Sequence, residues 1–536
     1  MRTGAREDVT TDIGAGERYT VGIDLGTTRT GVARATEDSP ELIRNAGGEW
    51  LTPSVVHLSE QGTALVGREA EEKHLMNPDR TVVEIKRRMG EEDPIQVGTE
   101  RFRPEELSAL ILEKVVADSE QRLGGQIPEA VITVPAYFTD RQRTATRNAG
   151  EIAGLQVSQL LPEPSAAVLA YGYEQQKLGK TENETLFVYD LGGGTFDATL
   201  VEAEYEFNFI ETVLTDGDSG LGGADWTAEI EDWVISGIEE DTGVDIRSTG
   251  SNADQLNRIR EAATEAKHKL TSQSATNVTV PFVLPQQGYS FERKLTRERF
   301  EEMTRPLLER TRETVDRVFE KTDFVPADVD TVLLVGGSSR MPQVAAMLES
   351  YFEQQPSKRI DPDQAVAMGA AIQATILDSD ASEGAKYIGG TDEEEGTTAG
   401  VSLIEVLPQT LGVGLVNDGF APVIEQGTQL PTTVRKETFS TVDPDQTDVK
   451  WPIHQGESDR ASENDLLGTL WIRDIPPRAP DQESIAIEFT MTMDGTLEVE
   501  VEDLLSGKLI DGTIESGIRL SPNEIEEMSD ELPHLE

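Results

Sequence analysis

The pattern of apolar and polar residues changes character part-way along the chain. Up to about residue 377, apolar runs such as TVGID, AVITVPA, TLFVYDL and TVLLVGG alternate with helical stretches such as residues 104–123. Strands that alternate with helices predict an α/β architecture. From about 407 to 520 the apolar runs are short, alternate with polar residues and are separated by Gly, Pro and Asp. This second pattern is typical of an all-β module.

Segments without apolar periodicity surround these two regions. Residues 1–18 predict a disordered N-terminal tail. Residues 378–406 are acidic and rich in Gly, and predict a flexible interdomain linker that ends in the apolar stretch VSLIEV. Residues 521–536 begin with SPNE, a capping-box sequence, and predict a short C-terminal helix of about two turns. The predicted domains are therefore 19–377 and 407–520.

Three Gly-rich turns each follow an apolar run: VGIDLGTTRT (21–30), VYDLGGGTFD (188–197) and VLLVGGSSRM (332–341). Glycine lets the backbone approach a phosphate closely, and successive N–H groups form a concavity that binds anions. Asp24 and Asp190 end the first two apolar runs, and a carboxylate supplies the hard oxygen that magnesium requires, usually through water. Two such turns and a third without Asp predict a nucleotide held between two lobes.

The charge of the chain is strongly negative. Its 536 residues contain 47 Lys and Arg against 100 Asp and Glu, a formal net charge of −53. Such a surface repels nucleic acid and anionic membranes, so we expect neither as a partner. We interpret the acidity as a solvated surface of a halophilic protein, which dense ions screen and dilute buffer destabilises. The absence of Cys excludes disulfides and thiolate metal sites, and without a long apolar segment we expect a cytoplasmic protein.

Longer motifs accompany the three turns: VPAYFTDRQRTATRNAGEIAGL (134–155), LLPEPSAAVLAYG (160–172) and DPDQAVAMGAAIQA (361–374). Together they resemble the 70-kilodalton heat-shock chaperone family (DnaK type), over residues 19–377 and on through 401–520. The resemblance implies an α/β actin-like, ribonuclease-H-like ATPase domain of two lobes, followed by an all-β sandwich that binds peptides. It further implies a stress-response chaperone that binds extended apolar segments of unfolded proteins and releases them under the control of ATP binding and hydrolysis.

The resemblance assigns catalytic roles to five residues: Lys86, Glu163, Asp190, Thr195 and Asp197. Asp24 and Asp190, with Glu163 and Asp197, would hold hydrated magnesium and orient the attacking water, and Lys86 would steady the developing charge. Judged without the resemblance, Lys86 reads as a surface cation beside Arg87 and Arg88. Glu163 stands between two prolines, which predicts a rigid turn rather than a helix.

The resemblance also implies the remaining nucleotide contacts. The phosphates would be held by Gly26, Thr27 and Thr28 from one lobe and by Gly192, Gly193, Gly194 and Thr195 from the other. The adenosine side would be bound by Gly222, Gly223, Lys267, Thr271, Gly336, Gly337, Ser338, Arg340 and Asp363. Thr264 stands where the family carries a Glu against the sugar, which brings the nucleotide affinity into question. The implied cofactors are ATP or ADP, Mg²⁺ and K⁺.

In the β-rich module, the family's peptide cleft matches Val413, Leu415, Val416, Phe439, Val442, Val449, Trp451 and Ile485. The alternative is that these residues form an ordinary sandwich core. Trp451 replaces a position that is usually a smaller aliphatic residue, which would narrow the pocket. Pro135 and Arg143 match the family's relay between the nucleotide and the second domain.

Several departures from the family pattern keep a second reading open. The chain ends where a helical lid would follow, which predicts rapid peptide release, and the long linker predicts weak coupling between the domains. Gln159 and Pro162 replace a basic residue and an Asn, which questions the docking of J-domain co-chaperones and leaves a nucleotide-exchange factor as a candidate partner. The alternative function is a nucleotide-gated actin-like scaffold for one dedicated protein partner. A small-molecule kinase on the same fold is a third reading, which leaves the β-module unexplained.

Overall fold

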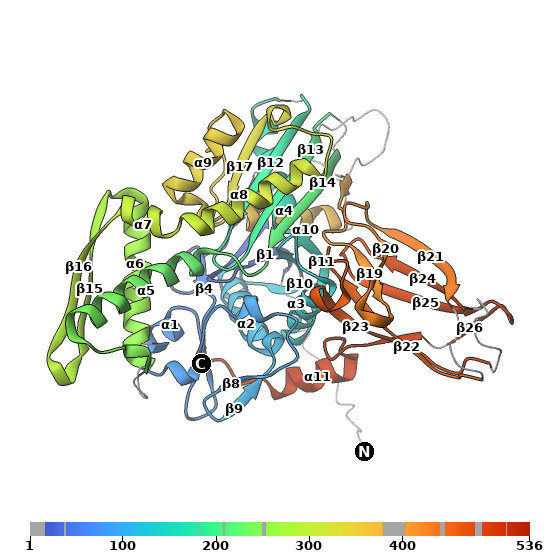
Figure 1. Ribbon diagram of the computed structural model, residues 1–536, viewed down its shortest axis with the longest axis horizontal. Helices are drawn as coiled ribbons and strands as arrows, with labels where there is room; N and C mark the ends of the chain where they lie inside the picture. The colour runs from blue at the N-terminus through green and yellow to red at the C-terminus, as the bar shows by residue number, and fades with distance from the viewer. Residues whose placement is uncertain are drawn as a thin grey trace, which may run out of the picture.

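The structure is a computed structural model. It describes residues 17–536 except 37–38, 75, 181, 207–208, 249–252, 379–401, 440–444, 477–484 and 511. The expectations for the tail up to residue 16, for most of the linker and for Val442 lie outside the described residues. The described chain forms two lobes, here called lobe I and lobe II, with the β-rich domain packed on one flank of both (Figure 1).

Lobe I is built on a six-stranded sheet of order β11-β10-β1-β2-β3, with β4 paired to β2. Strands β1, β10 and β11 run parallel, whereas β2 runs antiparallel to β1 and β3. The strands of this sheet are β1 (Arg18–Leu25), β2 (Arg29–Ala35), β3 (Pro40–Leu42), β4 (Leu51–Pro53), β10 (Gln126–Val134) and β11 (Gln156–Pro162). Two small sheets add β5 (Val56–Leu58), β6 (Ala64–Val66), β7 (Thr81–Val82), β8 (Ile95–Val97) and β9 (Glu100–Phe102).

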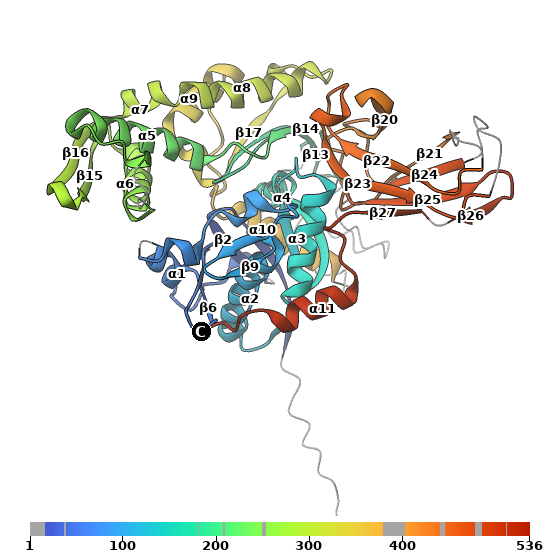
Figure 2. The same ribbon diagram turned by 60° about the horizontal axis from the view of Figure 1, so that its bottom comes forward.

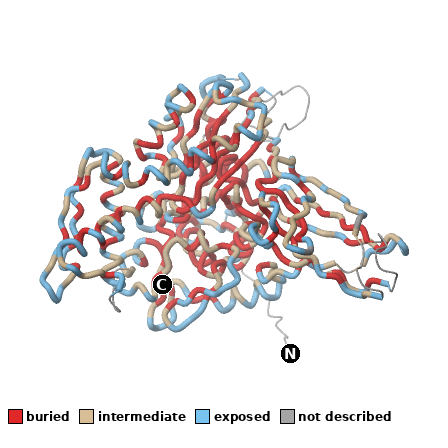
Figure 3. The backbone as a smooth tube through the Cα atoms, viewed as in Figure 1, coloured by how far each residue is buried: buried red, intermediate tan, exposed pale blue. Residues whose placement is uncertain are grey.

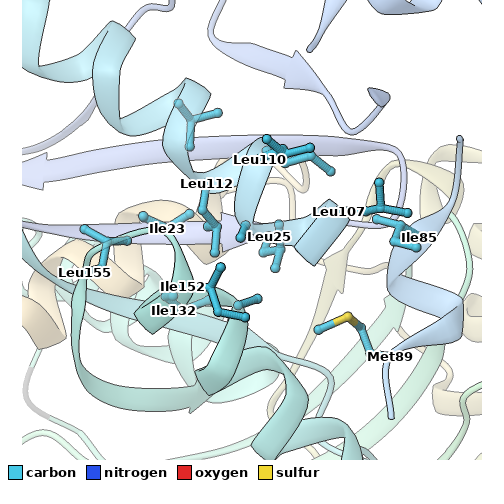
Figure 4. Close-up of a cluster of buried hydrophobic side chains, with 14 of the residues drawn as sticks. Ile23, Leu25, Ile85, Met89, Leu107, Leu110, Leu112, Ile132, Ile152 and Leu155 are labelled. Atoms are coloured by element: carbon cyan, nitrogen blue, oxygen red, sulfur yellow. The ribbon is translucent and has the colours of Figure 1, made fainter. Parts of the chain in front are cut away.

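The helices of lobe I are α1 (Arg68–His74), α2 (Pro104–Leu123) and α3 (Asp140–Ile152), and a short 3-10 turn, η2 (Ile85–Arg88), lies between α1 and α2 in the chain. The predicted helix over 104–123 is confirmed as α2. It begins at a proline, which the first turn tolerates, and ends at Gly124 with a left-handed φ of 74°. Its apolar face packs with β1, β10 and α3 in a buried cluster that also holds Ile85, the first residue of η2, and Met89, the residue after it (Figure 4).

Lobe II repeats the arrangement of lobe I. Its five-stranded sheet has the order β17-β12-β13-β14-β18, with an antiparallel meander of β12, β13 and β14 and a parallel neighbour, β17. The strands are β12 (Glu184–Leu191), β13 (Phe196–Glu204), β14 (Phe209–Asp218), β17 (Thr331–Val335) and β18 (Ser402–Ile404), with an outer hairpin of β15 (Ala275–Leu284) and β16 (Tyr289–Thr296). The helices are α5 (Gly223–Thr242), α6 (Ala253–Ser272), α7 (Arg297–Met303), α8 (Arg305–Glu320) and α9 (Pro342–Phe352).

Two helices join the lobes. α4 (Glu163–Lys177) follows β11 of lobe I and packs on β12 of lobe II, whereas α10 (Ala365–Leu377) packs on β1 and β2. The two helices pack against each other in one buried cluster between the sheets. Figure 3 shows the buried residues concentrated along these central sheets and helices. The predicted two-lobed α/β architecture is confirmed.

The β-rich domain is a sandwich of a five-stranded and a four-stranded antiparallel sheet, as predicted. The first sheet holds β19 (Leu411–Gly414), β20 (Phe420–Ile424), β22 (Val449–Gln455), β23 (Asp465–Ile472) and β27 (Gly512–Glu515). The second holds β21 (Thr432–Phe439), β24 (Ile485–Met491), β25 (Leu497–Asp503) and β26 (Lys508–Ile510). One apolar cluster from both sheets fills the space between them.

Two segments differ from their sequence expectations. The end of the predicted flexible linker forms strand β18, which pairs in parallel with β14 at the edge of the lobe II sheet. The C-terminal helix α11 (Pro522–Glu531) has ten residues, closer to three turns than to two, and its predicted capping box is confirmed by the bond from the Glu524 N–H to the Ser521 hydroxyl. α11 lies along lobe I beside α2 and α3 (Figure 2). The sequence alone could not show either contact, because both depend on surfaces far away in the chain.

Candidate active site

The three Gly-rich turns meet at one cavity between the lobes. The β1–β2 and β12–β13 hairpins carry the first two turns, and the third follows β17. The cavity has a volume of about 780 Å³, within the range of small-molecule sites. Of the residues expected around the nucleotide, those that line it are Asp24, Gly26, Thr27, Thr28, Lys86, Glu163, Asp190, Gly192, Gly193, Thr195, Gly223, Lys267, Thr271, Gly336, Gly337, Ser338, Arg340 and Asp363.

The other three expected residues, Gly194, Gly222 and Asp197, do not line the cavity. A Cβ on Gly222 would lie 2.4 Å from the Gly194 Cα, so the two glycines permit a close backbone contact. The N–H of Gly223 donates to the carbonyl of Gly192 (3.0 Å) beside this contact. The start of α5 is therefore fixed directly against the second Gly-rich turn.

Acidic side chains converge at the floor of the cavity. Burial and, after it, the negative charge of Glu163 raise the pKa of Asp24 to about 7. Burial and the same neighbour raise the pKa of Asp197 to about 7. Asp190 is raised well above its usual pKa for the same reasons, and its buried Oδ2 has no hydrogen-bond partner. Crowded, buried carboxylates with an unpartnered oxygen fit a site for a hydrated cation.

Within the described residues no group of three His, Cys, Asp or Glu side chains is arranged to ligate a metal ion directly. Magnesium in proteins is commonly held by one or two carboxylates together with water and phosphate oxygens. Asp24 and Asp190 are the residues that would hold it.

Lys86 and Glu163 form an ion pair on the cavity wall, and both side chains are buried. Lys86 is therefore not the surface cation that its neighbours in the sequence suggested. The expectation of a rigid turn at Glu163 is wrong, because this residue is the first of α4. The prolines on either side are compatible with a helix here, since Pro162 precedes the helix and Pro164 lies in its first turn, where no N–H is needed.

The opposite wall carries the residues expected near adenosine. The Lys267 ammonium donates to the Gly223 carbonyl (2.6 Å), and burial lowers its pKa to about 8. The Arg340 guanidinium donates to Asp363 Oδ2 (2.7 Å) and to Asp361 Oδ1 (2.5 Å). Thr264 lines the same wall.

Sequence reasoning missed a group of residues at the rim of the cavity: Glu49, Trp50, Arg68, Glu231 and Arg260. Arg68 pairs with Glu49 (2.7 Å) in lobe I, and Arg260 pairs with Glu231 (2.9 Å) in lobe II. No local pattern marks these residues, since they reach the site only because the two lobes face each other.

A hydrogen-bonded chain links the β-sandwich to Asp197. The Arg143 guanidinium donates to the carbonyls of Asp494 (3.2 Å) in the sandwich and of Ala136 (2.9 Å) in lobe I. The N–H groups of Ala136 and Tyr137 in turn donate to the Asp197 carboxylate (3.2 and 3.1 Å). The segment that begins at Pro135 therefore lies between the second domain and the cavity floor.

Comparison with known proteins places this geometry in a family. The family model described as Hsp70 protein matches residues 20–535. The chaperone protein DnaK of Halobacterium salinarum is 40% identical over 514 residues, which cover 95% of this chain and 77% of the relative. The proteins of the same name from Thermotoga maritima and Thermosipho melanesiensis are 39% and 38% identical, and each alignment covers 97% of this chain and 84% of the relative.

The chain belongs to the Hsp70 family. It is accordingly an ATP-dependent chaperone and an ATPase, with an actin-like nucleotide-binding domain and a β-sandwich for substrate. The scaffold alternative is not favoured by these relatives. None of the helices in the described part of the chain has the length and apolar character to cross a bilayer.

The residues expected in the Hsp70 peptide cleft separate into two groups. Val413, Val449 and Ile485 are buried in the sandwich core, as the alternative interpretation of an ordinary sandwich core predicted for them. Phe439 and Trp451 pack on that core as an aromatic pair with ring centroids 4.8 Å apart. The second group is at the surface: Leu415, one residue beyond β19, is 54% exposed. The Val416 backbone lies in a 3-10 turn, and its side chain and Val442 are outside the described structure.

Gln159 was expected to replace a basic residue of the family. Its side chain is buried and accepts a hydrogen bond from Gln373 Nε2 (2.8 Å) in α10. Pro162, the other departure, is the residue that precedes α4. Gln159 therefore presents neither charge nor surface for a partner.

Proposed function

We propose that this Hsp70 protein hydrolyses ATP to ADP and phosphate in the cavity between its lobes and uses the nucleotide to control peptide release from the β-sandwich. The observation that carries the proposal is the convergence of three phosphate-type turns, the carboxylates of Asp24 and Asp190 and the Lys86–Glu163 pair on one cavity. Positioning and electrostatic stabilisation are what phosphoryl transfer requires of a protein.

The residues of the first two turns bind the phosphates. The backbone N–H groups around Gly26 and Gly192 present donors to phosphate oxygens, and the hydroxyls of Thr27, Thr28 and Thr195 add further donors. Asp24 and Asp190 would hold a magnesium ion through its waters, and the ion would neutralise phosphate charge. Glu163 and Asp197 orient a water molecule whose oxygen forms the new bond to the γ-phosphorus as the bond to the β,γ-bridging oxygen breaks.

Lys86 donates to the developing charge in this reaction. In the structure its ammonium is already paired and buried, so little reorganisation is needed when the phosphate arrives. Lys267, Arg340 and Asp363 orient the adenosine side from lobe II. Because Thr264 offers no carboxylate to the sugar of the nucleotide, we expect the affinity for ATP and ADP to be modest.

Coupling to the peptide site runs through Arg143 and Pro135. Strand β18 adds a second link, because the Glu405 carboxylate just beyond it accepts from the Thr212 hydroxyl (3.1 Å) of β14. Both links hold the sandwich against the lobes. Opening of the lobes moves these attachment points apart, and in this way the bound nucleotide changes how the sandwich is held and how fast it releases peptide.

The peptide site lies on the surface of the sandwich near the exposed Leu415, above the core that holds Val413 and the Phe439–Trp451 pair. The substrates are extended apolar segments, which add backbone hydrogen bonds at a strand edge while an apolar side chain fills a pocket. The bulk of Trp451 favours small apolar side chains in that pocket.

The cellular setting follows from charge and composition. A net charge of −53 indicates a halophilic, cytoplasmic protein that works at high potassium, with K⁺ as a companion of Mg²⁺ in the site. Heat or salt stress, which exposes apolar segments, is its expected context. A nucleotide-exchange factor fits as a partner, whereas buried Gln159 argues against the usual J-domain docking.

Replacement of Lys86 by Ala tests the catalytic assignment. The variant is expected to lose at least about a hundredfold in single-turnover ATP hydrolysis in molar KCl, and to keep ATP affinity within about threefold. The Arg88→Ala variant is the matched control, since Arg88 pairs only with Glu91 (2.7 Å) among the ion pairs of the described chain. Unchanged hydrolysis in Lys86→Ala would remove this residue from the mechanism.

A further inference from the structure

Arg87, beside the catalytic lysine in the sequence, crosses from lobe I to lobe II. Its Nη2 donates to the carbonyl of Gly220 (2.8 Å) and to the two carboxylate oxygens of Asp225 (3.3 and 3.2 Å). We propose that Arg87 is an interlobe positioning residue, which fixes Lys86 against the second phosphate turn when the lobes close. The inference rests on the proposed hydrolytic function of the same cavity.

The lobe I end of this contact is rigid. Arg87 lies in η2, whose first residue, Ile85, and the residue after it, Met89, are only 2% and 3% exposed in the lobe I core (Figure 4). Lys86 is the next residue in the same turn and points to the cavity. The turn therefore moves with lobe I, and the distance from Lys86 to the phosphate turn of lobe II depends on how the lobes are joined.

The lobe II end is attached directly to that phosphate turn. Asp225 Oδ2 also accepts from the N–H of Gly222 (2.8 Å), at the start of α5. The next N–H groups of α5, from Gly223 and Ala224, donate to the carbonyls of Gly192 (3.0 Å) and Gly193 (2.8 Å). Arg87 is thus connected to the second Gly-rich turn through the Asp225 carboxylate and the N–H groups at the start of α5.

The space for Arg87 is provided by a missing side chain. A Cβ on Gly194 would lie 2.7 Å from Arg87 Cγ and 2.8 Å from Cδ. The Arg87 side chain passes close to the Gly194 backbone, so any larger residue at 194 would displace the arginine. Its side chain is 24% exposed, against 39% for Arg88 in the same turn.

Arginine suits this role because its Nη2 bonds both the Gly220 carbonyl and Asp225 while Nη1 lies 3.7 Å from Glu84 Oε2 in lobe I. A lysine carries a single point charge at this position and can pair with Asp225, but it cannot hold the Gly220 carbonyl in the same geometry. The pairing with Asp225 is therefore expected to survive in part in an Arg87→Lys variant, whereas the full constraint on the lobes is not.

The first experiment measures single-turnover ATP hydrolysis and equilibrium ATP binding in molar KCl with Mg²⁺. Arg87→Ala is expected to slow hydrolysis at saturating ATP by at least about tenfold while ATP affinity changes by less than about threefold. Arg87→Lys is expected to recover part of the rate, and Arg88→Ala to match the wild type. Hydrolysis by Arg87→Ala within about twofold of the wild type overturns the proposal. So does a loss of affinity as large as the loss of rate, because that result would make Arg87 a binding residue.

A second readout does not depend on hydrolysis. The chain has no cysteine, so Met76→Cys in lobe I and Phe282→Cys in lobe II, both at exposed positions, accept a pair of fluorescent dyes for energy transfer. ATP is expected to change the transfer efficiency in the otherwise unchanged chain and to change it less when Arg87→Ala is added. Equal changes with and without Arg87→Ala contradict the proposal. A wild type and a Lys86→Ala variant that are equally inactive would instead refute the hydrolytic function, and the dye measurement would still decide the role of Arg87.

Discussion

At the scale of single residues, the buried carboxylates beside the cavity lower the stability of the folded protein. Asp24 and Asp197 each have a pKa of about 7, because they are buried beside Glu163. A buried carboxylate with a raised pKa disfavours the folded state whenever it is ionised. A cation between the carboxylates would offset this repulsion. The same residues therefore favour cation binding and lower the stability of the protein without a cation.

The Asp197→Asn variant tests this cost. Since the pKa of Asp197 is raised in the folded state, its contribution to stability is fully present below the usual value of 3.8 and is lost as the pH rises through 7. Without nucleotide or magnesium, we expect Asp197→Asn to raise the melting temperature by a few degrees at pH 8 and by much less at pH 5. Calorimetry at constant KCl measures both values. An equal gain at the two pH values would show that ionisation of Asp197 is not the cause.

Individual residues of the site could be predicted where the local backbone dictates their chemistry. Asp24 and Asp190 end apolar runs, and the glycines after them mark turns that bind anions, so sequence was enough for both. Lys86 needed the family resemblance, because its own neighbours are two further cations. Arg87 and Trp50 could not be predicted, since nothing local shows that one spans the lobes and the other lines the cavity.

At the scale of elements, strand β19 separates the core of the sandwich from its binding surface. Val413 points into the core at 4% exposure, whereas Leu415 follows the strand at 54% exposure. The eight residues matched to the family's cleft therefore do not form one surface. A charge at Val413 would disrupt the core as well as any peptide contact, so Leu415 is the better position to change.

The Leu415→Asp variant is expected to weaken binding of a fluorescent apolar peptide by about tenfold and to leave the melting temperature and basal ATPase rate unchanged. Leu505→Asp is the matched control, because Leu505 is also a leucine of the β-sandwich that is exposed, at 57%. Anisotropy titration in molar KCl measures the affinities. Equal peptide binding by the wild type and Leu415→Asp would place the cleft elsewhere on the sandwich.

Helices and strands could be predicted where their own sequence pattern determines the structure. They were harder to predict where contact with a distant part of the chain determines it. Helix α2 and the central strands follow from periodicity. Glu163 was expected in a turn because prolines flank it, yet the first turn of a helix accepts proline. Strand β18 was expected to be linker, since only the exposed edge of β14 makes a strand of three residues there.

At the scale of the whole molecule, the C-terminal segment fastens the sandwich to lobe I. After β27 the chain leaves the sandwich, and the Arg519 side chain pairs with Asp140 (3.2 Å) at the start of α3. Ile518 and Leu532 are buried in the lobe I core, and Leu535 packs against it. The N–H of Ala64 in β6 donates to the His534 carbonyl (2.9 Å), so the segment ends as a partner of a lobe I strand.

A double variant, Leu532→Asp with Leu535→Asp, is expected to release this segment. Hydrogen exchange of the β6 peptide that contains Ala64 should then rise by at least about tenfold, because its amide loses the His534 acceptor. Glu526→Ala, on the exposed side of α11, should leave the exchange unchanged. Protection of Ala64 that persists in the double variant would mean that the segment is not held by its leucines.

Hydrolysis and peptide binding are coupled only if the bound nucleotide changes the rate at which the sandwich releases peptide. The dissociation rate of a fluorescent apolar peptide, measured in molar KCl with ATP–Mg²⁺ and then with ADP–Mg²⁺, tests this directly. With Arg143, β18 and the C-terminal segment joining the sandwich to the lobes, we expect ATP to speed dissociation by at least about tenfold over ADP. Equal rates with the two nucleotides would contradict the account and would leave the sandwich a peptide binder that the ATPase does not control.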